Sequence, residues 1–354
     1  MTRILWHSHS PLQATGYGKP TALWLPKLRD MGYEVLGSAF QGIPAEDKDM
    51  FFQGIPVVNT DDGKYGSTVL RDIAKFNSID VIITLMDVWV FDPAALKDMK
   101  VFHWFPVDTD PLSLLDETFF KRSEGVPVSI SQQGERLLRE AGFKGFSIPY
   151  TYDQSLFYVD DARREKARKD QHLEGWFAVG INAAPVPRKA WAEQLAAFSR
   201  LQRNHPGEVV LLINTSADPS GEVKLPPDAF RWTGGMPDAE MADWYRMLDV
   251  LSACSYGEGF GLPILEAQAC GTPVIVTDSA PVNEEPGLLA RKVACKPIWN
   301  DMYHAYWHKP SVAKLHEALE DAFAKRERDP EIAEYVKKYT VDAVAPQWDA
   351  ILRA

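Results

Sequence analysis

The sequence is poor in three features that define large classes of proteins. Its three cysteines, at positions 254, 270 and 295, show neither CxxC nor metal-ligand spacing, which argues against a disulfide framework or a zinc site. No stretch approaches the roughly 18 apolar residues of a membrane span, and the start, MTRILWHSHSPLQ, lacks a signal-peptide core. Basic residues number 38 against 49 acidic ones, and the net charge of −11 argues against a stable nucleic-acid partner. We expect a soluble protein of the reducing cytoplasm.

The sequence is rich in short apolar runs that alternate with amphipathic segments. This alternation is typical of βαβ units and a parallel sheet. A chain of 354 residues has the length for about two domains of about 150–180 residues each, and its 45% hydrophobic content can fill two cores. The expected strands lie at 3–8, 33–38, 55–59, 80–85, 100–105, 126–131, 176–181, 208–214, 230–235, 249–255 and 273–278, and the expected helices at 20–31, 67–76, 132–142, 189–204, 239–248 and 262–270.

A charged stretch at 147–175 interrupts the alternation, and we place a linker and a domain boundary there. The α/β series resumes after it, so the sequence predicts two doubly wound α/β domains in tandem. The tail, 311–329 and 330–354, has helical periodicity. In sheets of this kind ligands bind at the carboxyl ends of strands, and two such domains that face each other would form a cleft.

The segment YGEGFGLPILEA (256–267) carries the clearest functional signal. It follows a predicted buried strand, contains three glycines in a turn, and has Pro263 where the first helical turn should begin. Glycine lets the main chain approach a ligand closely, and a helix N-terminus with its exposed amides favours phosphate. We therefore expect the main chain of Gly259, Phe260, Gly261 and Leu262 to bind a diphosphate.

Two glutamates flank this turn, Glu258 before it and Glu266 one turn inside the helix. Helical side chains lean toward the N-terminus, so Glu266 should reach back toward the same ligand. Carboxylates would repel phosphate, and they should instead accept hydrogen bonds from hydroxyl groups. We assign a sugar hydroxyl to Glu258 and a ribose hydroxyl to Glu266. A diphosphate between two sets of hydroxyls is the shape of a nucleotide sugar; the alternative is a turn followed by a solvated glutamate.

The arrangement resembles the E-x7-E motif of retaining GT-B glycosyltransferases, and the stretch WYRMLDVLSACSYGEGFGLPILEAQACGTPVIVTD (244–278) is similar to family 4 throughout. The resemblance implies a GT-B fold of two Rossmann-like domains across a cleft. It places an acceptor-side domain at 1–155, a nucleotide-sugar domain at 156–335, and a C-terminal helix at 336–354 that packs toward the first domain. It also implies no metal and no cofactor beyond the donor.

A second element, GINAAPVPRKAW (180–191), follows the first strand of the second domain. Arg188 and Lys189 open a helix there, where cations are electrostatically misplaced by a few tenths to about 1 kcal/mol each. An anion should compensate them, and in similar glycosyltransferases an Arg and a Lys neutralise the donor diphosphate. The usual pattern has Arg directly after the strand glycine, where this chain has Ile181, so Arg188 would substitute. Asn182 is a further candidate for the donor site, and the alternative is a surface Arg-Lys pair.

The loop after the next predicted strand, FRWTGGMPDAEMADWY (230–245), is the third candidate element. By resemblance, Gly234, Gly235 and Met236 offer main-chain contacts to the base of the donor. Main-chain contacts do not depend on particular side chains, so the sequence does not distinguish a uracil from a guanine base.

The first domain offers less explicit candidates. Its first strand leads into HSHSPLQATGYGKP (7–20), where Gly16, Tyr17 and Gly18 could admit a phosphate at the next helix. The family usually has a Gly-Gly pair here. In KVFHWFPVDTDP (100–111), His103 is the candidate for a donor-sugar contact, since relatives place a histidine after this strand; the alternative is a position inside the strand. Asp108 is the second candidate for a sugar or acceptor contact.

The resemblance implies a front-face mechanism, in which the leaving phosphate takes the acceptor proton and Lys189 and Arg188 stabilise the developing charge. The leading hypothesis is a retaining transferase that uses a UDP- or GDP-sugar. Two alternatives are a non-catalytic nucleotide-sugar-binding or partner-binding protein on a GT-B scaffold, and a related epimerase or phosphorylase. A phosphorylase would need pyridoxal phosphate and a longer chain. The acceptor stays open among glycan, protein, lipid and modified DNA base.

Overall fold

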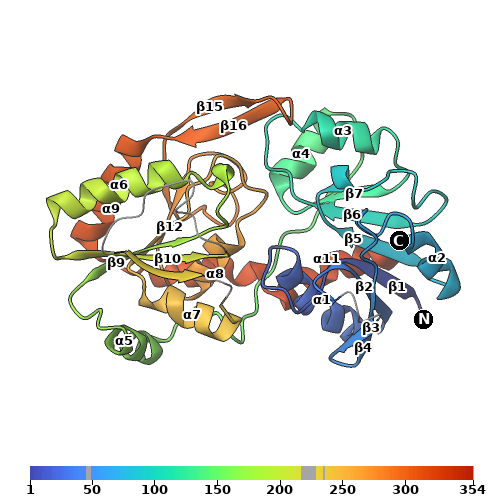
Figure 1. Cartoon of the computed structure of the whole chain (residues 1–354), viewed down its shortest axis with the longest axis horizontal. Coiled ribbons are helices and arrows are strands. Elements are labelled where there is room, and N and C mark those ends of the chain that lie inside the picture. The colour runs from blue at the N-terminus through green and yellow to red at the C-terminus, as the bar shows by residue number, and fades with distance from the viewer. Residues whose placement is uncertain (45–48, 217–228, 234–235, 354) are drawn as a thin grey trace. The chain divides into compact units, whose positions relative to one another are not determined.

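The computed structural model describes residues 1–44, 49–216, 229–233 and 236–353, and these residues form two compact units. Figure 1 shows that each unit contains its own sheet with helices packed against it. Unit 1 comprises Met1–Thr151, Asn300–Ala305 and Tyr339–Ala354, and unit 2 comprises Tyr152–Trp299 and Tyr306–Lys338.

Unit 1 is built on an eight-stranded sheet in the order β3-β4-β2-β1-β5-β6-β7-β8. Neighbouring strands are parallel except for β3 and β4, which form an antiparallel pair at one edge. The central strands are buried on both faces, so they read as continuous apolar runs. The strands are β1 Arg3–His9, β2 Glu34–Gln41, β3 Asp49–Phe52, β4 Ile55–Asn59, β5 Val81–Leu85, β6 Val101–Phe105, β7 Val126–Ser129 and β8 Phe146–Ser147.

Two helical layers cover this sheet. One core combines side chains of α2, α3 and α4 with those of β1, β5 and β6. The other contains four fully buried tryptophans, Trp6, Trp24, Trp104 and Trp348, whose ring centroids lie 5.5–6.4 Å apart where the rings meet edge to face. Trp348 comes from α11, so the end of the chain completes this core. The helices are α1 Gly18–Asp30, α2 Leu70–Phe76, η1 Val88–Val90, α3 Leu114–Phe120, α4 Gln132–Glu140 and α11 Val341–Arg353, and the short helix η4 Lys337–Tyr339 lies where the chain passes from unit 2 back to unit 1.

Unit 2 is built on a six-stranded sheet in the order β11-β10-β9-β12-β13-β14, in which every neighbouring pair is parallel. Side chains of β9, β10 and β12 are buried on both faces. Gly180 in β9 allows close packing, because a Cβ there would lie 2.3 Å from Leu248 Cδ1. The strands are β9 Phe177–Asn182, β10 Val209–Thr215, β11 Ala229–Thr233, β12 Val250–Ser252, β13 Val274–Thr277 and β14 Arg291–Val293.

Helices α6 and α9 pack together on one face of this sheet and share its main apolar core. Helices α7 and α8 contact each other, α5 packs on α7 and α10 on α8, and Figure 1 shows α7 on the side of the sheet away from α6. The expected series of strand and helix is therefore present. The helices of unit 2 are α5 Asp161–Asp170, η2 Pro187–Lys189, α6 Trp191–Asn204, α7 Asp238–Met247, α8 Leu262–Ala269, α9 Val312–Lys325 and α10 Pro330–Val336.

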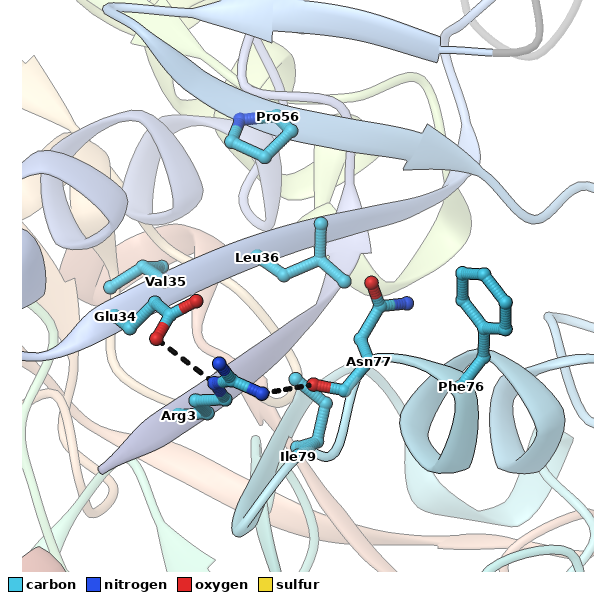
Figure 2. A pocket seen from close by; sticks show the side chains of 8 residues that line it. All are labelled: Arg3, Glu34, Val35, Leu36, Pro56, Phe76, Asn77 and Ile79. Atoms are coloured by element: carbon cyan, nitrogen blue, oxygen red, sulfur yellow. Dashed lines mark hydrogen bonds and ion pairs between the residues drawn. The ribbon is translucent and has the colours of Figure 1, made fainter. Parts of the chain in front are cut away.

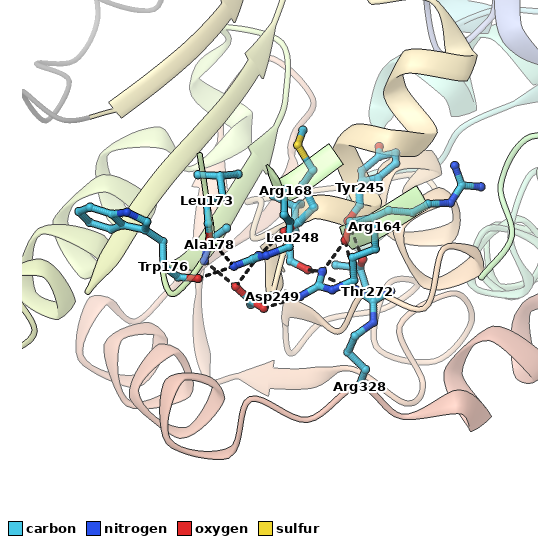
Figure 3. A network of polar contacts seen from close by, with 12 residues as sticks. Arg164, Arg168, Leu173, Trp176, Ala178, Tyr245, Leu248, Asp249, Thr272 and Arg328 are labelled. Carbon is cyan, nitrogen blue, oxygen red and sulfur yellow. Dashed lines mark hydrogen bonds and ion pairs between the residues drawn. The ribbon is translucent and has the colours of Figure 1, made fainter. Parts of the chain in front are cut away.

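Several elements were not predicted from the sequence, among them β3, α3, β8 and β14 and the two segments described next. The charged stretch that we predicted as a linker contains α5, a helix without a buried residue, which arginines fasten to unit 2 (Figure 3). Arg164 and Arg168 reach Asp249 at 2.6 and 3.0 Å, and Arg164 also donates to the carbonyl of Leu248 at 2.6 Å. Charged groups bonded at the end of α7 and beside β12 thus hold α5 in place of the apolar face that a periodic pattern would show.

A two-stranded hairpin, β15 Cys295–Asn300 and β16 Ala305–Pro310, lies outside both sheets and was not predicted. Consecutive strands joined by a short loop pair in the antiparallel sense, as Figure 1 also shows. Trp299 and Tyr306 meet across the two strands with ring centroids 5.1 Å apart. The predicted helix at 330–354 is divided into α10, η4 and α11.

Candidate functional site

A pocket in unit 2 lies where the carboxyl ends of β9 and β12 meet the start of α8. This is the place where ligands bind in parallel α/β sheets. Its lining combines small residues from the strand ends with one cation and one carboxylate. The lining residues are Asn182, Ala183, Lys189, Gln194, Ser252, Ala253, Cys254, Ser255, Glu258, Gly261, Pro263 and Ile264.

The cations come from η2, a single 3₁₀ turn between β9 and α6. Ala190, which follows it, has a left-handed backbone with φ of 48°, and α6 begins at the next residue. Arg188 and Lys189 therefore lie just before α6 rather than inside its first turn. The Lys189 carbonyl accepts a hydrogen bond from Gln194 Nε2 at 2.8 Å, and Gln194 Oε1 accepts one from Ser252 Oγ at 2.7 Å. The loop is thus anchored to α6 and β12.

Glu258 forms an ion pair with Lys189, and its second oxygen lies 3.7 Å from Arg188 Nη1. Arg188 also donates to the Gly257 carbonyl at 2.5 Å. Burial alone would raise the pKa of Glu258, but the two cations outweigh it and hold that pKa below its usual value. The predicted cations and carboxylate, far apart in the sequence, therefore form one charged cluster on the pocket.

The turn before α8 has the geometry that only glycine adopts readily. Gly261 has φ of +101°, and a Cβ there would lie 2.6 Å from Ile264 Cδ1. The Phe260 and Leu262 side chains are buried, so only their main-chain atoms remain for a ligand. Gly259 is buried beside them. The predicted role of residues 259–262, main-chain binding of a diphosphate at a helix start, fits this arrangement.

Glu266 is buried on α8, and the structure connects it to the end of β9 through a residue that the sequence analysis missed. Tyr245 Oη donates to Glu266 Oε2 at 2.9 Å and accepts from Asn182 Nδ2 at 2.6 Å. Asn214 donates to Asn182 Oδ1 at 2.9 Å. Burial and the neighbouring Glu266 raise the pKa of Tyr245 well above its usual value, so it stays a hydroxyl donor. Asn182 and Glu266 thus belong to one network.

Tyr245, Asn214 and Gln194 were not predicted from the sequence. Each is a buried or nearly buried polar residue on the buried side of a helix or strand. That conflict between residue type and periodic pattern is the signal that could have identified them. Met236 lies in the segment before α7, and Gly234 and Gly235 fall outside the described residues.

The three candidates near the start of α1 belong to unit 1. Gly18 is tightly enclosed by its own chain, because a Cβ there would lie 2.2 Å from the Gln13 carbonyl oxygen. This contact explains the glycine without a phosphate. Gly16 has open space around its Cα, and Tyr17 precedes the first residue of α1. Burial raises the pKa of Tyr17, and a hydrogen bond to Asp87 adds to the effect.

His103 lies inside β6, as the second of the two predicted alternatives has it. The structure shows the interior alternative: the ring is buried against Phe119 and Phe120. Its Nδ1 bonds to Thr84 Oγ1 at 2.8 Å and its Nε2 to Ser123 Oγ at 3.3 Å. Burial lowers the pKa of His103 to about 3, so the ring is neutral at physiological pH. These contacts favour a structural role.

Asp108 follows β6 and lies in an acidic part of unit 1, near the end of β5 where Asp87 is found. Burial raises the pKa of Asp116 to about 7, although Ser113 donates a hydrogen bond to its carboxylate, and Asp108 and Asp87 raise that pKa further. Asp108 is half-buried at the carboxyl edge of the sheet. It remains the candidate of unit 1 for a sugar or acceptor contact.

A larger hollow in unit 1 lies at the opposite edge of its sheet, where β1 and β2 begin (Figure 2). Arg3 crosses it to bond Glu34 at 2.9 Å and the Asn77 carbonyl at 3.3 Å. Since parallel sheets bind ligands at their carboxyl ends, this hollow is not the candidate site.

Comparison with known sequences finds proteins similar to unit 2. Residues 177–296 match the sequence model of the family "Glycosyl transferases group 1". The resemblance of residues 244–278 to glycosyltransferases of group 1 is therefore confirmed. A D-inositol 3-phosphate glycosyltransferase of Kribbella flavida is 54% identical over 48 residues, 14% of this chain and 11% of the relative. The same-named protein of Frankia alni is 36% identical over 137 residues, 35% of this chain and 33% of the relative. The chain thus matches only a third or less of these relatives' length.

Solved structures extend the likeness over the whole chain at the level of fold. Sucrose-phosphate synthase of Thermosynechococcus elongatus has a TM-score of 0.78 at 16% identity, covering 100% of this chain and 98% of its own. Anabaena HepE, solved in complex with UDP-glucose, has a TM-score of 0.72 at 15% identity and covers 100% of both chains. The predicted fold class is confirmed: two Rossmann-like units of a GT-B fold.

Within the part of the chain that the structure describes, no helix combines the length and the apolar character that a bilayer crossing requires.

Proposed function

We propose that this protein is a retaining glycosyltransferase that moves a sugar from a UDP- or GDP-sugar to an acceptor without a metal ion. The observation that carries the proposal is the charged cluster of Lys189, Arg188 and Glu258 beside the start of α8. A helix start with two cations matches a diphosphate, and a carboxylate beside it matches a sugar hydroxyl. The group 1 match and the UDP-glucose complex of the HepE neighbour support this interpretation.

In the proposed reaction the bond between the sugar and the diphosphate breaks while the acceptor oxygen attacks from the same face. The diphosphate gains negative charge, which Lys189, Arg188 and the amides of residues 259–262 stabilise, and its oxygen takes the acceptor proton. Glu258 orients the sugar and stabilises its positive character. Glu266, which Tyr245 holds by a hydrogen bond, accepts hydrogen bonds from the ribose hydroxyls. Removing one such charge contact should cost about 2.7–4 kcal/mol, a hundred- to thousandfold in rate.

The free site would then change on donor binding. Lys189 is bonded to Glu258 in the structure, and a diphosphate would compete with the carboxylate for this ammonium group. Glu258 would turn its released oxygen toward the sugar. The pair therefore keeps both charges compensated until the donor arrives, which avoids the large penalty of burying an unpaired charge.

The test is a panel of nucleotide sugars, beginning with UDP-glucose and GDP-mannose, assayed for release of the nucleoside diphosphate. We expect turnover with at least one donor, retained in excess EDTA. Glu258→Gln and Lys189→Ala should reduce it about a hundredfold or more. Lys314→Ala, which removes an exposed lysine of α9 from a pair with Glu317, is the control and should leave the rate unchanged. Full activity of Glu258→Gln would refute the site, and loss of activity in EDTA would refute metal independence.

A second candidate function is nucleotide-sugar binding without catalysis. It is favoured by Ile181, a core residue at the place where the usual pattern has an arginine. Binding of UDP by calorimetry with no release from any donor would establish it. The acceptor stays open among glycan, protein, lipid and modified DNA base. The three free cysteines support a reducing compartment, and we propose the cytoplasm.

A further inference from the structure

A buried carboxylate lies behind the candidate site without being part of it. Glu193, in the first turn of α6, is only 4% exposed. Its Oε2 accepts a hydrogen bond from Tyr256 Oη at 2.9 Å, and its Oε1 lies 2.9 Å from Lys309 Nζ in β16. Both carboxylate oxygens are therefore engaged, one by a neutral donor and one by a cation.

Tyr256 occupies a central place among the segments that form the site. Its amide donates to the Arg188 carbonyl at 2.7 Å, and its carbonyl accepts from the His308 amide at 2.6 Å. Glu258 follows it by two residues. One residue thus joins the loop of cations, the loop of the carboxylate, helix α6 and strand β16.

The hairpin strand adds contacts to the same ring. Trp307 lies with its ring centroid 6.4 Å from that of Tyr256, and Lys309 Nζ lies 6.0 Å from the ring centroid. The Tyr256 side chain is therefore held by its hydroxyl at one end and by packing along its ring. Burial and the adjacent Glu193 raise the pKa of Tyr256, so the hydroxyl keeps the proton it donates.

We propose that Glu193 and Tyr256 are positioning residues. They hold the main chain at residue 256 so that Glu258 and the Arg188–Lys189 loop are directed at the same bound donor. This inference rests on the proposed transferase function. A buried carboxylate is costly unless it is well bonded, and apolar residues could pack α6 without that cost. A displacement of about 1 Å at a reacting centre can lower a rate about a hundredfold. The directional bonds of Glu193 and Tyr256 can therefore raise the rate in a way that apolar packing would not.

Positioning predicts a particular kinetic pattern. Tyr256→Phe keeps the ring and removes the hydroxyl, and Glu193→Gln keeps the shape and removes the charge. Each should lower kcat about 10- to 100-fold, while KM for the donor and the Kd for UDP change less than about threefold. The double variant should be less impaired than the product of the two single effects, because both variants weaken the same contact between Tyr256 and residue 193.

Two further variants separate positioning from folding. Lys309→Met removes only the cation of a lysine whose side chain is 51% exposed, so it should fold normally and still lower kcat. Glu317→Gln, on the exposed face of α9 and paired with Lys314, is the matched control and should change neither constant. Thermal unfolding of each variant, followed by assay well below its midpoint, shows whether lost activity is lost fold.

The outcomes distinguish this inference from the function on which it rests. If the unmodified protein neither binds UDP nor releases it from any donor, the proposed function fails first. If it is active and Tyr256→Phe, Glu193→Gln and Lys309→Met all keep kcat within about twofold, the positioning role is refuted. It is equally refuted if KM rises while kcat is unchanged, or if assays at low temperature restore the full rate.

Discussion

At the scale of single residues, the Lys189–Glu258 pair shows how a site can store opposite charges away from water. Both side chains are mostly buried, and each compensates the other. A carboxylate with a lowered folded-state pKa contributes stability above its unfolded pKa of about 4.3, and this contribution is lost as the pH falls through the folded value. The pair therefore stabilises the protein at neutral pH and weakens in acid.

Replacing one partner should reverse this dependence. In Lys189→Met, burial of Glu258 would be opposed only by the more distant Arg188, so its pKa should rise. A raised carboxylate pKa destabilises the folded state above that pKa and ceases to do so below it. We expect unfolding free energy at pH 7 to fall by up to about 3 kcal/mol. Adding Glu258→Gln should recover part of the loss at pH 7 but little near pH 4. Urea unfolding at both pH values measures these free energies. A double variant no more stable than Lys189→Met at pH 7 would contradict the prediction.

Tyr245 provides a second prediction at this scale. Tyr245→Phe removes the donor that orients Glu266 and leaves Asn182 without its hydroxyl acceptor. A hydrogen bond to a charged group contributes about 1.5–3 kcal/mol, so UDP should bind roughly tenfold or more weakly. Calorimetry measures this affinity. Tyr335→Phe, which removes a hydroxyl bonded to the Glu285 carbonyl, is the control and should leave UDP binding unchanged.

The charged residues of this site were predictable from the sequence, but the residues that hold them in place were not. Lys189, Arg188 and Glu258 were predicted from local patterns, because a helix start and its charges are short-range features. Tyr245 and Glu193 act through contacts with residues distant in the sequence, and no local pattern encodes such partners. The role of His103 could not be decided from the sequence. A single polar residue in an apolar strand can line a site or can bond to a buried partner such as Thr84, and the strand pattern is the same in both cases.

At the scale of elements, periodic apolar patterns identified the central strands and most helices, since these bury a regular face. Two of the elements that the sequence did not predict are held differently. Helix α5 has no buried face and is held by arginines, and strand β16 is bonded to Tyr256 and Glu193. Charge and hydrogen bonding are not periodic, so a search for periodicity passes over such elements.

The arginine network of α5 makes a prediction for this element. In Arg164→Met/Arg168→Met, α5 loses its bonds to Asp249 and to the carbonyls at the C-terminal end of α7 (Figure 3). We expect amide hydrogen exchange in α5 to accelerate about tenfold or more, while amides of β9 keep their protection. Lys166→Met, which breaks an exposed pair with Asp170 on the same helix, is the control. Equal protection of α5 in both variants would show that the arginines do not hold it.

At the scale of the whole molecule, the path of the chain decides which residues stabilise each of the two units. Unit 1 is discontinuous in sequence, because residues 339–354 return to it and place Trp348 among Trp6, Trp24 and Trp104. A local reading of 330–354 predicts helix but cannot say which core its apolar face enters. The tryptophan cluster therefore depends on the last residues of the chain, whereas the candidate site depends on unit 2.

This division predicts that the two units can be destabilised separately. Trp348→Ala leaves a cavity in a fully buried cluster and should cost about 3–5 kcal/mol, which for a unit of this size lowers its Tm by on the order of 10 °C. In scanning calorimetry the transition of unit 2, identified by its shift to higher temperature with UDP, should keep its midpoint. Trp299→Ala removes a ring that is 50% exposed and should shift neither transition by more than about 1–2 °C. If Trp348→Ala lowered both transitions equally, the two units would unfold as one, and the separation of stability from the candidate site would be wrong.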